Sequence, residues 1–131
     1  MPARHLFHHV VVFASDFRAS ESFYTGALAA LGITAGDRTE TGTEYWIAEH
    51  DTPSFALDTA PTSAEVTRGV HVAFEAADQS AVDAFHQAAV AAGGTSRHEP
   101  PHWPEYRAYC AFVSDPDGNN IEALVKDAAA S

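Results

Sequence analysis

Three residues far apart in the chain, His9, His71 and Glu122, have the types and spacing to bind one metal ion. Each histidine opens a short apolar, β-branched run, and Glu122 lies in IEALV, residues 121–125, directly after the turn formers DPDGNN. Two imidazoles and one carboxylate suit divalent Fe, Mn, Ni, Co or Zn, and three ligands on one side leave the other positions open for water, oxygen or substrate. The pattern therefore predicts a metal site of unspecified metal.

Glu122 needs a partner if its strand is covered on both faces. Side chains alternate along a strand, so Glu122 and Leu124 share one face of the predicted strand. Burying a carboxylate costs several kcal/mol unless an opposite charge or hydrogen bonds offset the cost. A bound cation is one solution. An ordinary ion pair with Arg107 or Lys126 is the alternative, with the two histidines as hydrogen-bonded core residues.

The chain repeats itself with an offset of 62 residues. HVVVFASDFRASESFYTGALAALG, from His9, aligns without a gap with HVAFEAADQSAVDAFHQAAVAAGG, from His71, and ten of the 24 pairs are identical. The identical pairs include a histidine, an aspartate, a phenylalanine and a glycine. The chain is therefore predicted to contain two copies of one module, about residues 5–60 and about 68–126, within a single domain that spans residues 1–131.

Each copy predicts the same order of elements, β-α-β-β-β. Strands are expected over 9–13 and 70–74, and helices follow the N-cap residues Asp16 and Asp78 and end at glycines 32 and 93–94. Further strands are expected over 44–49 and 54–59, and over 106–114 and 120–125. Repeat symmetry predicts that the two first strands lie side by side at the centre of a curved sheet. His9 is preferred over His8 as the ligand, because neighbouring strand residues point to opposite faces.

Composition excludes several classes of partner. The formal net charge is −11, from 7 basic and 18 acidic residues, so phosphate backbones and anionic membranes are expected to be repelled. The sequence holds no tract of eighteen apolar residues, and its start, MPARHLFHHVVVF, lacks the pattern of a signal peptide. A cytoplasmic protein is expected. The single cysteine, Cys110, is expected to be an inert core residue, because its strand is apolar.

The repeat, together with HVAF and YCAFVSDPDGNNIEAL, resembles the vicinal oxygen chelate superfamily, which includes glyoxalase I, bleomycin resistance proteins and extradiol dioxygenases. The resemblance runs from about Phe7 to Val125. It implies an α+β fold in which two paired βαβββ modules form a cupped mixed β-sheet with helices on the outer face, commonly as a homodimer. It also implies a divalent metal that chelates adjacent substrate oxygens, held by His9, His71 and Glu122.

One position departs from that pattern. Glyoxalase-type members carry a fourth ligand, usually Glu, on the last strand of module one, where this chain reads SFALDTA. Matching FAL to IEA puts Ala56 at that position. Asp58, two residues on, faces the same way and is the candidate fourth ligand or base if the register shifts. With Ala56 as the true equivalent, the site resembles the two-histidine, one-carboxylate type found in dioxygenases and fosfomycin transferases.

Candidate residues for a substrate pocket come from two segments. Tyr45 and Trp46 lie on a predicted strand of module one. RHEPPHWPEYRAY, residues 97–109, either forms a rigid turn over the end of the sheet or supplies a pocket wall for an apolar or aromatic substrate. Its candidate residues are His98, His102, Trp103, Tyr106 and Arg107. A phosphonate substrate is disfavoured, because Arg107 and Lys126 are the only cations near the predicted metal site.

Two functions follow from these expectations. The first is a metal-dependent enzyme, either a glyoxalase-like lyase or isomerase or a ring-opening dioxygenase, acting on vicinal oxygens of a small organic substrate. The catalytic residues are not assigned by the sequence. The second is a metal-free protein, resembling bleomycin resistance proteins, that sequesters a cationic or aromatic ligand. The negative net charge is compatible with the second function.

Overall fold

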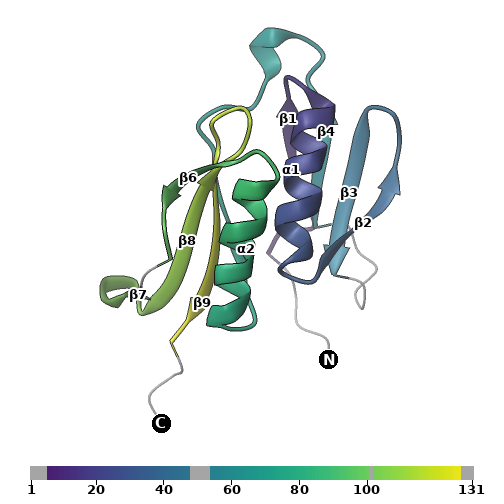
Figure 1. The fold of residues 1–131 in the computed structure, drawn as a ribbon. Helices are drawn as coiled ribbons and strands as arrows, with labels where there is room; N and C mark the ends of the chain where they lie inside the picture. The colour runs from purple at the N-terminus through teal and green to yellow at the C-terminus, as the bar shows by residue number, and fades with distance from the viewer. Residues whose placement is uncertain (1–5, 48–53, 101, 128–131) are drawn as a thin grey trace.

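The computed structural model describes residues 6–47, 54–100 and 102–127. It confirms two βαβββ modules within one chain (Figure 1). The first module contains β1 (Val10–Ala14), α1 (Phe17–Ala29), β2 (Ile33–Arg38), β3 (Gly42–Ile47) and β4 (Phe55–Thr59). The second contains β5 (His71–Glu75), α2 (Gln79–Ala91), β6 (Thr95–His98), β7 (His102–Trp103), β8 (Ala108–Ser114) and β9 (Asn120–Lys126). Short 3₁₀ turns lie at Ser63–Glu65 and Pro104–Tyr106.

The two helices begin and end where the repeat predicts. The side chains of Asp16 and Asp78 accept hydrogen bonds from the backbone N–H groups of Ala19 and Ala81, three residues on, as N-cap residues do. Gly32 and Gly93 follow the helices with φ of 76° and 105°, a left-handed conformation that glycine adopts without strain. Local sequence signals therefore determine both helices.

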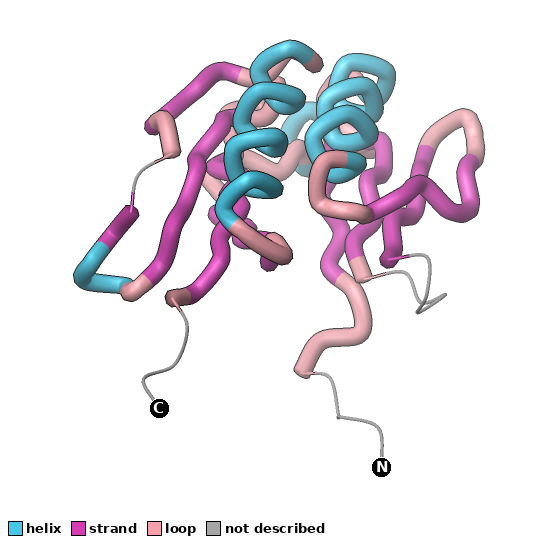
Figure 2. The backbone as a smooth tube through the Cα atoms, turned by 60° about the horizontal axis from the view of Figure 1, so that its bottom comes forward, coloured by secondary structure: helices cyan, strands magenta, loops and turns pink. Residues whose placement is uncertain are grey.

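The strands form two sheets. The first has the order β1-β4-β3-β2 and the second β5-β9-β8-β6, with β7 paired to β8. The prediction that the two first strands lie side by side is wrong, because each takes its parallel partner from its own module: β1 pairs with β4, and β5 pairs with β9. Helices α1 and α2 pack against each other instead, and a sheet extends to either side of them (Figures 1 and 2).

The core lies between the helices and one face of each sheet. Buried residues from both helices, such as Phe23 and Phe85, pack with strand residues of both modules, such as Leu57 and Ile121. Gly94 lies in close contact with Phe23 and Val113, and an added Cβ there would lie 2.5 Å and 2.6 Å from their side-chain carbons. The helices thus cover one face of each sheet. We call the opposite face of each sheet its open face.

The DPDGNN turn between β8 and β9 is buried. Its polar residues Asp115, Asp117 and Asn119 are 5%, 9% and 0% exposed. The Tyr24 hydroxyl donates to Asp115, and the Asn119 amide donates to Asp115 and to the backbone carbonyl of Thr67. The turn packs against α1 and the segment that joins the modules. The turn therefore fixes the two modules relative to each other.

None of the helices in the described ranges is long and apolar enough to cross a membrane.

Candidate functional site

His71 and Glu122 meet on the open face of the second sheet. His71 opens β5 and Glu122 lies on the neighbouring strand β9, where it pairs with Ala73. The distance from His71 Nε2 to Glu122 Oε1 is 2.7 Å. Glu122 is 7% exposed, whereas the His71 side chain is 54% exposed. The buried carboxylate therefore has an imidazole partner that remains accessible from the open face.

Period-two alternation along β9 and β8 puts Glu122 on this face. Ile121 and Ala123 pack in the core, so Glu122 between them points the other way. Cys110 on β8 lies on the same face, and its thiol donates a hydrogen bond to Glu122. Burial and the Glu122 carboxylate raise the pKa of the Cys110 thiol to about 12. At neutral pH the thiol is protonated, which agrees with the expectation of an unreactive buried cysteine.

A row of rings extends from His71 across the same sheet. Ring centroids lie 6.1 Å apart for His71 and Phe112, 6.0 Å for Phe112 and Trp103, and 5.2 Å for Trp103 and His98. His98 and Trp103, both predicted as pocket residues, are thus connected to the His71–Glu122 pair. Phe112 was missed by the sequence analysis. Its alternation with Cys110 on the predicted strand was the signal that could have found it, because β8 pairs Phe112 directly with Glu122.

The other predicted pocket residues have different places. Tyr45 is 1% exposed and its hydroxyl lies 2.9 Å from Thr25 Oγ1 on α1, so it belongs to the core and not to the open face. Trp46, the next residue on β3, points away from the helices and packs over Gly36. Arg107 is exposed and directly precedes β8. His102 lies on β7 and Tyr106 in the 3₁₀ turn, and their side chains lie outside the described part of the structure.

His9 directly precedes β1 of the first sheet, apart from the pair. It lines a cavity of about 310 Å³ on that sheet's open face, together with Glu44, Ala56 and Asp58. The sequence suggested that His8 and His9 point to opposite faces, but their Nδ1 atoms lie 2.9 Å apart. The alternation rule does not apply here because β1 begins only at Val10. Among the residues that the structure describes, no three His, Cys, Asp or Glu side chains lie close enough to hold one metal ion.

The strand registers settle which residue of module one corresponds to Glu122. Ala73 pairs with Glu122, and its equivalent at the repeat offset, Val11, pairs with Ala56. Ala56 is therefore the structural equivalent of Glu122, as the match of FAL to IEA indicated. Asp58 pairs with Phe13 and so corresponds to Leu124, one step further along the strand.

Two of the three predicted ligands, His71 and Glu122, lie close together in one chain. An imidazole nitrogen and a carboxylate oxygen converge on an accessible face, which suits a divalent cation of the kinds predicted. Module one offers His9 on an equivalent open face, in a cavity whose described lining contains three carboxylates: Asp37, Glu44 and Asp58.

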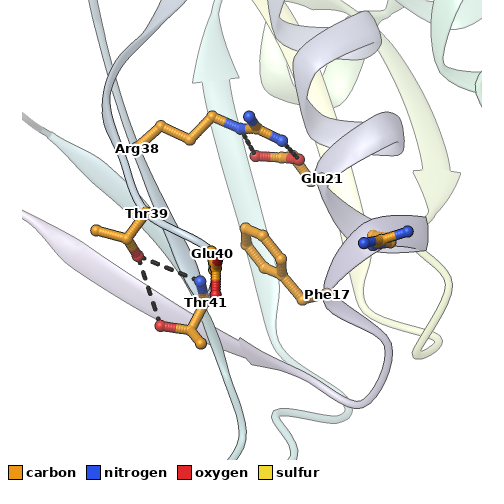
Figure 3. Close-up of a pocket in the computed structure, with 7 residues that line it drawn as sticks. Phe17, Glu21, Arg38, Thr39, Glu40 and Thr41 are labelled. Atoms are coloured by element: carbon orange, nitrogen blue, oxygen red, sulfur yellow. Dashed lines mark hydrogen bonds and ion pairs between the residues drawn. The ribbon is translucent and has the colours of Figure 1, made fainter.

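A larger cavity of about 670 Å³ lies elsewhere, between α1 and the β2–β3 turn, beside the Glu21–Arg38 ion pair (Figure 3).

Residues 6–123 match the model of the Glyoxalase/Bleomycin resistance protein/Dioxygenase superfamily, and the chain belongs to that superfamily. A solved structure of a glyoxalase/bleomycin resistance protein from Albidiferax ferrireducens T118 is 34% identical with a TM-score of 0.78, over 92% of this chain and 98% of that one.

Two more distant solved structures show likeness of fold alone. A glyoxalase/bleomycin resistance protein/dioxygenase from Nocardioides is 22% identical with a TM-score of 0.64, over 100% of this chain and 89% of that one. A lactoylglutathione lyase from Agrobacterium tumefaciens is 19% identical with a TM-score of 0.65, over 95% of each chain. No curated protein matches the sequence significantly.

Proposed function

We propose that the protein is a metal-dependent enzyme of the glyoxalase and dioxygenase class, which acts on vicinal oxygens of a small organic substrate. The observation that carries the proposal is the 2.7 Å approach of His71 to the buried Glu122 on an accessible sheet face. Membership of the superfamily supports the class of chemistry. A divalent ion, of Fe, Mn, Ni, Co or Zn, would supply Lewis acidity to the substrate oxygens when bound.

The third ligand, His9, would come from a second copy of the chain. Each chain presents one open face with His71 and Glu122 and another with His9, so a homodimer that apposes unlike faces completes two centres at once. Leu6 and Phe7, which precede His9, are 88% and 70% exposed. Apolar residues exposed to this degree beside a candidate site favour an interface that covers them.

The residues of this chain would bind and orient the substrate. The row formed by Phe112, Trp103 and His98 gives an aromatic surface next to His71, which favours a planar or apolar substrate. Glu122 would be a carboxylate ligand, and its packing among strand residues fixes the position of its side chain. The Cys110 thiol donates to it, which helps to fix the carboxylate in place.

Metal content of the purified protein tests the proposal. We expect near-stoichiometric metal in the wild type, and its loss in His71→Ala and Glu122→Gln. The matched control is His86→Ala, because His86 is also exposed and bonded to a neighbour, Ser96, but lies on α2 away from the open faces. Absence of metal from wild-type protein reconstituted with each of the five metals would contradict the proposal.

A metal-free binding protein is the second candidate. The specific observation in its favour is that His71, when protonated, can itself neutralise Glu122 through the contact at 2.7 Å. The aromatic row would then hold an aromatic or cationic ligand. Saturable ligand binding that is unchanged by chelator treatment, in a protein that takes up no metal, would favour this function over the enzyme.

A further inference from the structure

The two modules differ at one position of the candidate site. In module two the first-strand histidine has a carboxylate partner on the neighbouring last strand, Glu122. In module one the equivalent of that carboxylate is the methyl group of Ala56, as the strand registers show. Module one therefore has a histidine, His9, and an open cavity, but has no carboxylate on β4 at the matching position.

Glu44 lies on the next strand, directly opposite this gap. The β3–β4 register pairs Glu44 with Ala56, and both residues line the cavity that His9 lines. Directly opposed residues of antiparallel strands have Cβ atoms about 5 Å apart. A glutamate side chain is long enough to cross that distance, and Ala56 is too small to block it. A carboxylate of β3 can therefore occupy the space that a β4 glutamate would fill.

Asp58 is less well placed for this role. It lies two residues beyond Ala56, paired with Phe13, whereas His9 precedes the start of β1. Its Oδ1 atom packs over Gly42, in the space where a side chain at position 42 would begin. Because Gly42 has no side chain, the Asp58 side chain can lie toward β3. It therefore lies away from the end of the cavity where β1 begins.

The charge around the cavity favours a cation. Its described lining contains His9 and the carboxylates Asp37, Glu44 and Asp58, and no lysine or arginine. Uncompensated carboxylates in one concavity give a negative potential that raises the local concentration of cations. The negative potential and the gap opposite Glu44 are independent observations, and both favour a cation at this open face.

We infer that Glu44 supplies the carboxylate of the module-one half-site and, with His9, faces the same cation as the His71–Glu122 pair of a second chain. This inference rests on the proposed function. It assigns the role of fourth ligand, a second carboxylate, to β3 in place of the last strand, and it removes Asp58 from that role. A centre completed in this way holds two imidazoles and two carboxylates, although Ala56 replaces the carboxylate of β4.

Titration of chelator-stripped full-length protein with Co²⁺ alone, followed by the visible absorption of the bound ion, tests the inference. We expect Glu44→Gln to weaken Co²⁺ binding about tenfold or more and to change the absorption spectrum, as loss of a carboxylate near a metal does. Asp58→Asn is the comparison variant: it lowers the negative potential of the cavity but removes no ligand, so it is expected to weaken Co²⁺ binding clearly less than Glu44→Gln does. Ala56→Glu in the Glu44→Gln background is expected to restore tight binding, because it returns a carboxylate to the β4 position.

The outcomes separate this inference from the proposed function. If His71→Ala loses Co²⁺ binding but Glu44→Gln binds as the wild type does, Glu44 has no such role and the proposed centre stands. If Asp58→Asn weakens binding and Glu44→Gln does not, the fourth ligand is Asp58. If the wild type and His71→Ala bind Co²⁺ equally weakly, the proposed centre fails and the inference fails with it.

Discussion

The imidazole of His71 and the carboxylate of Glu122 lie 2.7 Å apart on adjacent parallel strands, with the carboxylate buried and the imidazole accessible. In the absence of a metal each group stabilises the other. This relationship makes the pair a contributor to stability as well as a candidate ligand set, and the two roles can be measured separately.

Removal of the imidazole should destabilise the metal-free protein. His71→Ala leaves the buried Glu122 with one donor fewer, which we expect to lower the free energy of unfolding by about 1–2 kcal/mol. His71→Ala combined with Glu122→Leu should recover part of the loss, since no buried carboxylate remains. Urea denaturation in the presence of chelator measures both. A destabilisation in His71→Ala no larger than in the His86→Ala control would contradict this account of the pair.

Tyr24 should make the protein sensitive to alkaline pH. Burial and the neighbouring Asp115 carboxylate raise the pKa of Tyr24 well above its ordinary value of 10.0. Above about pH 10 the unfolded chain loses this proton while the folded chain keeps it. Stability present below pH 10 should therefore decline as pH rises, by about 1.4 kcal/mol per pH unit from this group.

Tyr24→Phe checks that sign. The variant should be less stable at neutral pH by about 1–3 kcal/mol, because Asp115 loses the donated hydrogen bond. Its stability should also fall less steeply above pH 10 than that of the wild type. Denaturant unfolding at pH 7, 9, 10 and 10.5 gives both slopes, and parallel slopes for the two proteins would refute the assignment.

Gly94 should tolerate no side chain. A Cβ at this position would meet Phe23, Val113 and the backbone carbonyl of Ala89, at 2.5, 2.6 and 2.9 Å. We expect Gly94→Ala to lower the free energy of unfolding by about 1–3 kcal/mol through overpacking. Thermal unfolding followed by circular dichroism measures it. An unchanged midpoint would show that the helix-to-sheet packing at this point is looser than the structure indicates.

Sequence signals predicted the local elements well, because those signals act over a few residues. The N-cap aspartates, the terminal glycines and the alternation around Glu122 needed no knowledge of the rest of the fold. The strand β2 was not located, since ITAGDR is half exposed at a sheet edge and has little apolar pattern.

Errors arose where contacts between distant segments decide the outcome. β1 and β5 lie in different sheets and α1 packs against α2, an arrangement of distant segments that the repeat alone does not specify. No local signal indicated the hydrogen bond that Tyr24 donates to Asp115, 91 residues away in the sequence. The same limit applies to the site: the repeat aligned His9 with His71, but did not reveal that His9 lines a cavity of the first sheet while His71 lies on the second.

Metal content of mixed variants tests most directly whether two chains share the centre. His9→Ala and His71→Ala, purified separately, should each lack metal, because each spoils every centre of its own homodimer. After the two are unfolded, mixed in equal amounts and refolded with metal, heterodimers should contain one intact centre each, which gives about a quarter of the wild-type metal content. A mixture as metal-free as its components, beside a metal-loaded wild type, would show that the centre is not shared in this way.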